Sequence, residues 1–448
     1  MIATALVAGI VIGLAYTLSP LTVIATALLT VLIRTLAAAD DPHERRLLVT
    51  LVTIAVALRI AAVAVLFLWS DHQSRPFGTF FGDEDYFIKR AIWLRNAAVG
   101  IPISPADMRY AFDASIETSL VWILAALQIV FGPAPYGVHL FGIIAYVAGT
   151  LCLYRAVRPS FGMPAAMIAL ATVLFLPSLF SWSVSALKDP LFLALLAAVL
   201  AFTLAAMRGS TGIRLSAVAG VPAMLVAAET LRSGGLALLA MAIGGGLLAV
   251  AGWRRPRGAG LAAAAVLLAL PLALTRPNVQ DAAVVGAHRA VAAHWNHVRE
   301  PGVAYRLLDE AQYEKPIVIP ALGVGDTVRY ATRAVVAYLV VPLPWQVHST
   351  AARAFAPEQI VWLVLVGLAV VGVPAGLRRD PSTTLLLALS AMVLALGIAL
   401  TSGNIGTLVR HRSLALLPMA WLAGLGAVST LTWAPRWFGM SRSSAGSR

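Results

Sequence analysis

The chain of 448 residues has a mean hydropathy of +0.86 and a hydrophobic fraction of 60%, which excludes an ordinary soluble globular protein. Only 12% of the residues are charged, yet the formal net charge is +13. Because the arginines form small groups between apolar runs and no single basic face, this charge indicates the positive-inside bias of a membrane protein and argues against a nucleic-acid partner.

Apolar segments long enough to cross a bilayer recur along the chain, since a crossing needs about 20 residues. Short connectors that carry arginine are expected in the cytoplasm, and placing them there gives one consistent path. The predicted fold is all-α: a polytopic transmembrane helix bundle of about 11–12 spans in the bacterial inner (plasma) membrane. The predicted spans are 47–69, 137–154, 163–181, 190–207, 215–231, 235–252, 259–275, 358–377, 383–401 and 412–432, with one or two more within 1–33.

The same path divides the chain into three predicted regions. An N-terminal part holds the first membrane segment or segments and a cytoplasmic connector; it lacks the basic region and cleavage site of a signal peptide, so we expect it to be retained. A transmembrane domain and a cytoplasmic tail follow. The three regions are 1–46, 47–432 and 433–448.

Two large loops are predicted outside the cytoplasm, at 70–136 and 276–357. Each contains an apolar stretch, 119–131 in the first and about 331–341 in the second, that must not cross the membrane if the arginine placement is to hold. Both stretches are short and are followed by prolines. We therefore expect two helices that lie in the outer interface or dip partway into it.

The first of these loops contains an acidic cluster, Gly82-Asp83-Glu84-Asp85-Tyr86. Three consecutive carboxylates beside a membrane are unfavourable unless they face water. Adjacent side chains point in different directions on a helix, so at most two of the three can readily share a site. Such a carboxylate can take a proton from a hydroxyl group that acts as acceptor, which predicts a catalytic role. A generic acidic loop is the other interpretation.

This loop resembles the first external loop of the GT-C superfamily of lipid-phosphosugar-dependent glycosyltransferases. In that family an Asp-Glu, Asp-Asp or similar pair is often followed by a Tyr and an Ala-rich helix, and Asp83-Glu84, Tyr86 and Ala91 look like that pattern. The segments 181–190 and 403–418 are similar to later parts of such enzymes. The resemblance covers roughly residues 47–430 in layout, through short motifs.

The resemblance implies transfer of a sugar from a polyprenyl-phosphate donor to a glycan, lipid or protein acceptor on the extracytoplasmic face. It implies that Asp83 is the general base and that Glu84 or Asp85 positions the substrate or another side chain. Tyr86 is expected to contact the substrate. The sugar, the acceptor and the lipid carrier are left open.

Transfer from a lipid phosphate also needs cations that hold the departing phosphate. Candidates stand at turns predicted on the outer side, two of them in a short loop before the last span. Interfacial snorkelling is the alternative for each of these side chains. The candidate cations are Lys188, Arg232, Arg410 and Arg412.

Arg59 differs from these cations because it lies near the centre of the predicted span 47–69. A charge at that depth is expensive and usually faces the bundle interior with a partner. Both structural pairing and a role in the path of the lipid phosphate fit this position.

The second loop contains His294 and His297, whose spacing would place them on one helix face, as metal ligands sometimes are. No acidic or cysteine partner stands at ligand spacing, so a solvated amphipathic helix is favoured. No metal site is predicted, and a divalent metal cofactor is left open. Tyr305, Tyr313 and Trp345 are interpreted as interface aromatics.

Two other function classes remain. An O-antigen or exopolysaccharide polymerase is also polytopic, but its resemblance would rest on Arg-rich external loops, whereas this first loop is acidic. A transporter or flippase of lipid-linked sugars predicts repeated halves and charges along a midplane path. Only Arg59 is clearly deep, and the sequence shows no repeat, which ranks this class last.

Overall fold

The computed structural model describes most of the chain, and its internal contacts divide it into two compact units. The first unit is Met1–Pro159 with Leu170–Ala237, and the second is Ser160–Ala169 with Leu238–Arg448. The described residues are 9, 20–36, 41–71, 81–113, 118–133, 137–255, 277–300, 302–310, 313, 324–346 and 350–437.

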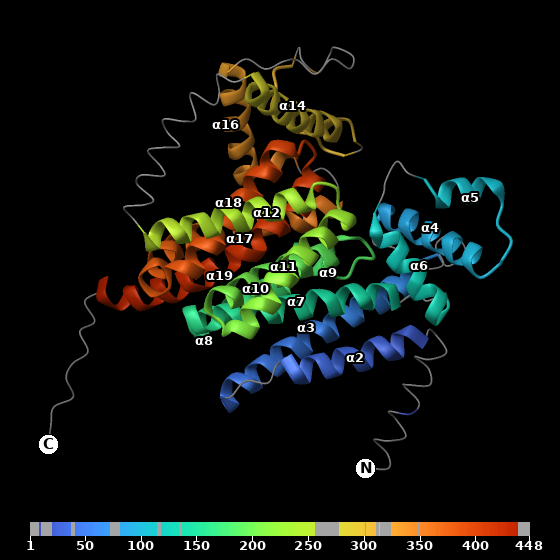
Figure 1. Ribbon diagram of the computed structural model, residues 1–448, viewed down its shortest axis with the longest axis horizontal. Helices are drawn as coiled ribbons and strands as arrows, with labels where there is room; N and C mark the ends of the chain where they lie inside the picture. Colours follow the sequence, from blue (N-terminus) through green and yellow to red (C-terminus); the bar gives the residue numbers. More distant parts are fainter. Residues whose placement is uncertain are drawn as a thin grey trace. The chain divides into compact units, whose positions relative to one another are not determined.

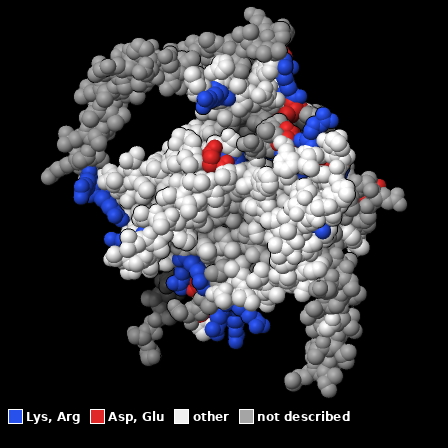
Figure 2. Space-filling view, turned by 45° about the vertical axis from the view of Figure 1, so that its right-hand side comes forward, with Lys and Arg blue, Asp and Glu red and all other residues white. Residues whose placement is uncertain are grey.

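The described residues form helices, with no strand among them beyond a single bridge between Ala304 and Asn404. Eight helices are long and apolar enough to cross a membrane, which confirms the polytopic all-α class. Figure 2 shows Lys and Arg in small separate groups, while other residues make up most of the visible surface. The eight are α3 (Pro42–Trp69), α7 (Gly137–Phe161), α10 (Asp189–Arg208), α11 (Thr211–Leu231), α12 (Gly235–Arg254), α17 (Thr350–Arg379, apolar from Pro357), α18 (Pro381–Thr401) and α19 (Ile405–Trp437).

The predicted span at 163–181 is bent and not one straight helix. The segment forms α8 (Met163–Phe175) and α9 (Pro177–Ser183), which meet at an angle of 60°. Pro177 explains the break, because it has no N–H group for the helical hydrogen bond and its ring collides with the preceding turn. If this bent pair counts as one crossing, the described residues hold nine spans.

Two further predicted crossings, the N-terminal one and 259–275, are not among these spans. The N-terminal helix α2 (Pro20–Leu36) has 17 residues, fewer than a standard crossing needs. The predicted span 259–275 lies outside the described residues, as does most of the segment before Pro20.

In the first unit, α10 packs against α11, and α2 lies beside α3 (Figure 1). Helices α7 and α10 come close because a small residue stands at their contact: a Cβ atom on Gly149 would lie 2.7 Å from the Cα atom of Ala194. Small residues are the usual means by which membrane helices approach, because van der Waals packing drives their association in lipid.

In the second unit, α17, α18 and α19 pack against one another (Figure 1). Gly372 of α17 and Gly426 of α19 allow this approach, since a Cβ atom on either would overlap a carbonyl group of the facing helix. Helices α14 (Pro277–Arg299) and α16 (Val324–Val340) both contact α18.

Between α3 and α7 the chain forms three shorter helices, α4 (Gly82–Ala98), α5 (Pro105–Ala111) and α6 (Ser119–Phe131). Both α5 and α6 pack against α4. Helix α6 has only 13 residues, and α16, which contains the second apolar stretch, has 17. Neither helix has the length of a crossing, as expected from the sequence, and their place at the interface stays a prediction.

Candidate functional site

The acidic cluster forms the first turn of α4. Carboxylates are favourable there, because the unpaired N–H groups at a helix N-terminus carry partial positive charge. The three side chains point in different directions, as helical spacing requires. Asp83 is exposed, Glu84 is fully buried, and Asp85 is partly exposed and forms an ion pair of 2.6 Å with Lys89 one turn later.

Glu84 connects α4 to a turn that lies about a hundred residues later in the sequence. Its carboxylate accepts hydrogen bonds from the backbone N–H of Ala186 at 2.9 Å and of Phe81 at 3.4 Å. The ring of Phe81 also stacks on Trp182, with centroids 4.3 Å apart. Two segments that the resemblance singled out separately, 81–86 and 181–190, therefore meet. With both oxygens bound to backbone groups, Glu84 has the geometry of a positioning residue.

The turn that Glu84 holds leads directly into α10. His139 of α7 also contacts this turn, since the Nδ1 atom of His139 lies 2.8 Å from the carbonyl oxygen of Val184. Lys188 is half-buried at the last position before α10, and Asp189 is buried at the first. Lys188 thus stands two residues beyond the backbone group that Glu84 binds. Arg232 follows α11, with its guanidinium group 5.8 Å from the centre of the Phe192 ring.

Tyr86 belongs to a second polar group on α4, which the sequence did not predict. Its hydroxyl donates to Oδ2 of Asp113 at 3.0 Å and accepts from Nη1 of Arg90 at 3.1 Å. Arg90 also donates to the carbonyl oxygens of Asp113 and Ala111, at 2.6 and 3.3 Å. Burial and the bond to Asp113 raise the pKa of Tyr86, so its hydroxyl stays protonated.

A cavity of about 710 Å³ lies beside this group, where α4, the N-terminus of α6 and the end of α11 meet. Arg90 and Asp113 line it, together with Ser119 and Glu229. Both carboxylate oxygens of Glu229 accept backbone N–H groups, from Gly234 at 3.0 Å and Leu236 at 2.9 Å, so this side chain caps the start of α12.

Arg59 is completely buried in α3 and bonds to neutral groups. It donates to Oγ of Ser183 at 2.8 Å and to the carbonyl oxygens of Leu174 at 2.8 Å and Ala55 at 3.0 Å. Its guanidinium also lies against the rings of Tyr146 and Phe180, at 5.4 and 4.8 Å. These partners surround the break between α8 and α9, which supports a structural role.

Arg410 and Arg412 belong to the second unit, and the prediction that they lie in a short loop is wrong. Helix α19 already begins at Ile405, because Asn404 caps it: its side-chain oxygen accepts the N–H of Gly406 at 2.8 Å. Both arginines therefore lie within the first turns of the last helix.

Arg412 is buried and holds the end of α16. It donates to Oε1 of Gln359 at 2.8 Å and to the carbonyl oxygens of Tyr338 and Val341. Its guanidinium lies 5.1 Å from the ring of Trp362. These contacts make Arg412 a structural partner of the α16 C-terminus, while Arg410 is half-buried on the same helix.

His294 is fully buried, so the interpretation of its segment as a solvated helix is wrong at this position. Its Nδ1–H donates to the carbonyl oxygen of Ser402 at 2.6 Å, and its Nε2 accepts from the hydroxyl of Tyr313 at 2.8 Å. That hydroxyl in turn accepts the N–H groups of Leu307 and Leu308, both at 3.1 Å. Tyr313 thereby links α14 to the backbone of Leu307 and Leu308.

Acid is expected to weaken the fold through His294. Burial lowers the pKa of His294 to about 4, although the hydrogen bond to the Ser402 carbonyl acts to raise it. An unfolded histidine has a pKa of about 6.5. Between these values the unfolded chain binds the proton and the folded chain does not, so the free energy of unfolding falls by up to roughly 3 kcal/mol as the pH drops from about 6.5 towards 4.

The measurement is the midpoint of thermal unfolding across this pH range, for the wild type and for His294→Gln. The variant should lose most of the dependence, while His288→Gln, at an exposed position of the same helix, should keep it. Equal dependence in wild type and His294→Gln would remove His294 as the responsible group.

No cluster of three or more His, Cys, Asp or Glu side chains suited to a metal ion occurs in the part of the chain that the structure describes.

Comparison with known proteins finds a likeness among solved structures alone. No protein-family model matches the chain, and no curated protein sequence matches it. A solved structure with a similar arrangement of helices is ArnT from Cupriavidus metallidurans bound to undecaprenyl phosphate, at 16% sequence identity and a TM-score of 0.44. The match covers 87% of this chain and 66% of the ArnT chain, so the chain spans about two thirds of the length of that structure.

Proposed function

We propose that the protein is a membrane glycosyltransferase, which transfers a sugar from a polyprenyl phosphate to an acceptor hydroxyl on the extracytoplasmic face. The observation that carries this proposal is the bond between Glu84 and the backbone of Ala186. It brings an exposed carboxylate, Asp83, and a cation, Lys188, into one neighbourhood beside the membrane-crossing helices. These are the two kinds of group that this reaction needs.

In the proposed reaction, the acceptor oxygen attacks the anomeric carbon of the donor sugar. The bond from that carbon to the phosphate oxygen breaks, and polyprenyl phosphate leaves with the bonding electron pair. Asp83 accepts the proton of the acceptor hydroxyl, and Lys188 stabilises the phosphate through its positive charge. Attack opposite the leaving group inverts the configuration at the anomeric carbon. Glu84 holds the segments 81–86 and 181–190 together through its bond to Ala186.

The test is transfer by the purified full-length protein in lipid nanodiscs. Undecaprenyl-phosphate hexoses and pentoses with a radiolabelled sugar serve as donors, and membrane extract supplies the acceptors. Release of free undecaprenyl phosphate together with label in a new product is the expected result. In parallel assays, turnover of pyrophosphate-linked oligosaccharides alone would instead identify a polymerase, and movement of intact lipid-linked sugar across the membrane of closed proteoliposomes would identify a flippase.

A further inference from the structure

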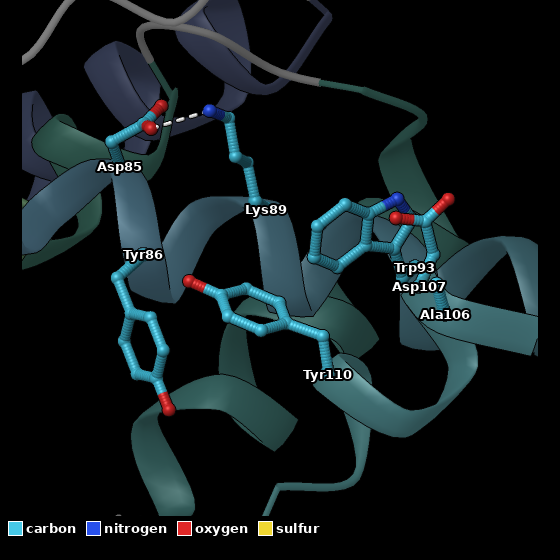
Figure 3. Close-up of a pocket in the computed structure, with 7 residues that line it drawn as sticks. All are labelled: Asp85, Tyr86, Lys89, Trp93, Ala106, Asp107 and Tyr110. Carbon is cyan, nitrogen blue, oxygen red and sulfur yellow. Dashed lines mark ion pairs between the residues drawn. The ribbon is translucent and has the colours of Figure 1, made fainter.

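A groove of about 530 Å³ lies between α4 and α5 in the first unit (Figure 3). Three positions of α4 at helical spacing, Asp85, Lys89 and Trp93, form one wall of it, because side chains four residues apart share a face. Tyr86 adds to this wall, and Asp107 and Tyr110 come from α5. None of the residues that line the groove accepts a proton or holds the phosphate in the reaction proposed above.

Three aromatic rings shape the groove. The ring of Tyr110 packs edge-on against Tyr86, with centroids 5.2 Å apart, and against Trp93, with centroids 5.1 Å apart. In Figure 3 the Tyr110 side chain extends from α5 towards α4, between these two residues. Edge-on packing fixes the ring planes, while Tyr110 keeps 38% of its surface exposed. The groove therefore presents rigid aromatic surface to solvent.

Charged groups stand beside the rings. Asp85 and Lys89 form their ion pair within the groove, where each keeps part of its surface exposed. Asp107 is held by Ser104, whose hydroxyl donates to its carboxylate at 2.7 Å and accepts its N–H at 3.1 Å. Carboxylate oxygens accept hydrogen bonds and an ammonium group donates them, so the groove offers both kinds of partner next to apolar rings.

A sugar ring matches this combination of surfaces. One face of a pyranose or furanose presents C–H groups that pack on an aromatic ring, and its hydroxyl groups donate and accept hydrogen bonds at the edge. Two carboxylates against one lysine make the groove unfavourable for a phosphate. The groove lies on α4 and α5, neither of which is among the crossing helices, and this favours a water-soluble ligand over a lipid tail.

We propose that the α4–α5 groove binds a saccharide, namely the acceptor glycan of the glycosyl transfer proposed above, on which this assignment rests. Tyr86 lies three residues after Asp83 on α4, so the groove begins one helical turn from the candidate base. A glycan that stacks on Tyr110 and Trp93 would extend along α4 towards Asp83. The donor lipid is expected elsewhere, since its phosphate needs a cation-rich environment.

Binding is tested with the full-length protein in nanodiscs and four neutral probes: oligosaccharides of glucose, mannose, galactose and arabinose. Saturation-transfer NMR detects binding, and titration of tryptophan fluorescence gives the affinity. At least one probe is expected to bind, and Tyr110→Ala and Trp93→Ala should each weaken it about tenfold. Tyr110→Phe, which keeps the ring, should bind nearly as the wild type does. The matched control is Trp253→Ala, at an exposed position of α12.

A kinetic measurement distinguishes a site for the acceptor glycan from a site for the sugar of the donor. For an acceptor site, Tyr110→Ala raises the KM for the acceptor about tenfold and leaves the KM for the donor unchanged. A higher KM for the donor alone would overturn the assignment, as would absence of binding by all four probes or equal binding by Tyr110→Ala and Tyr110→Phe. Equal unfolding midpoints of these two variants show that the fold is intact.

The saccharide assignment of the groove and the proposed function can be refuted separately. Asp83→Asn should bind the saccharide as the wild type does, because Asp83 is not among the residues that line the groove. Saccharide binding without any transfer activity would therefore refute the proposed function alone. Transfer activity with unchanged kinetics in Tyr110→Ala and Trp93→Ala would refute the groove alone.

Discussion

Replacing Asp83 by Asn is expected to lower kcat for glycosyl transfer by about 10²–10⁴-fold, the usual contribution of a general base. The amide keeps the size of the side chain but cannot take the proton of the acceptor hydroxyl. Asp83 is exposed, whereas the neighbouring Glu84 is buried, so the substitution should leave the helix and its contact with Ala186 in place. The measurement compares kcat at equal amounts of purified protein.

Asp326→Asn is the matched control, since Asp326 is also an exposed carboxylate in the first turn of a helix that is not among the crossing ones. It should change kcat little. Undiminished transfer by Asp83→Asn would remove Asp83 as the base. Loss of transfer in Asp83→Asn with an unfolding midpoint well below that of the wild type would point to a structural role instead.

Replacing Arg59 by Leu is expected to destabilise the protein by about 2–5 kcal/mol. The substitution removes the donors that reach the carbonyl group of Leu174 and the hydroxyl of Ser183. Leu174 and Ser183 are completely buried, as Arg59 is, so bulk solvent does not replace these donors. Unsatisfied polar groups in such surroundings cost about 1–3 kcal/mol each.

The midpoint of thermal unfolding in detergent provides the measurement. Leu58→Ala, at a half-exposed position next to Arg59 on α3, is the control and should shift the midpoint much less. Together with a transfer assay, this measurement distinguishes structural pairing of Arg59 from a role in the path of the lipid phosphate. If Arg59→Leu unfolds like the wild type but no longer transfers sugar, then Arg59 acts on the lipid phosphate rather than on the fold.

Hydropathy predicted the crossing helices well because the relevant signal is local. A run of about 20 apolar residues has few alternatives in a membrane protein. The sharp bend at Pro177 does not follow from hydropathy, because prolines inside membrane helices are often accommodated without one. Helix α19 began earlier than predicted since hydropathy ignores a capping residue such as Asn404.

The candidate site was predictable only in part. Helical spacing alone indicated that the three carboxylates of α4 diverge, and it also places Asp85, Lys89 and Trp93 on one face. The partners of these side chains outside α4 were not predictable. Glu84 and Ala186 are 102 residues apart, and only the fold brings them together. The same holds for Tyr110, whose helix has seven residues and no distinctive pattern. The role of Asp83 stays a prediction.

The break between α8 and α9 has a consequence for how this protein can change over evolution. Pro177 cannot bond to the carbonyl oxygen of Val173, which instead accepts the Tyr146 hydroxyl at 2.6 Å, one residue before the carbonyl that Arg59 binds. A straight helix would use both carbonyls itself, which would take from the buried tyrosine its bond to Val173 and from the buried arginine one of its three acceptors. Positions 59, 146 and 177 should therefore vary together among homologues, and a lineage that straightens this helix should lose the buried arginine as well.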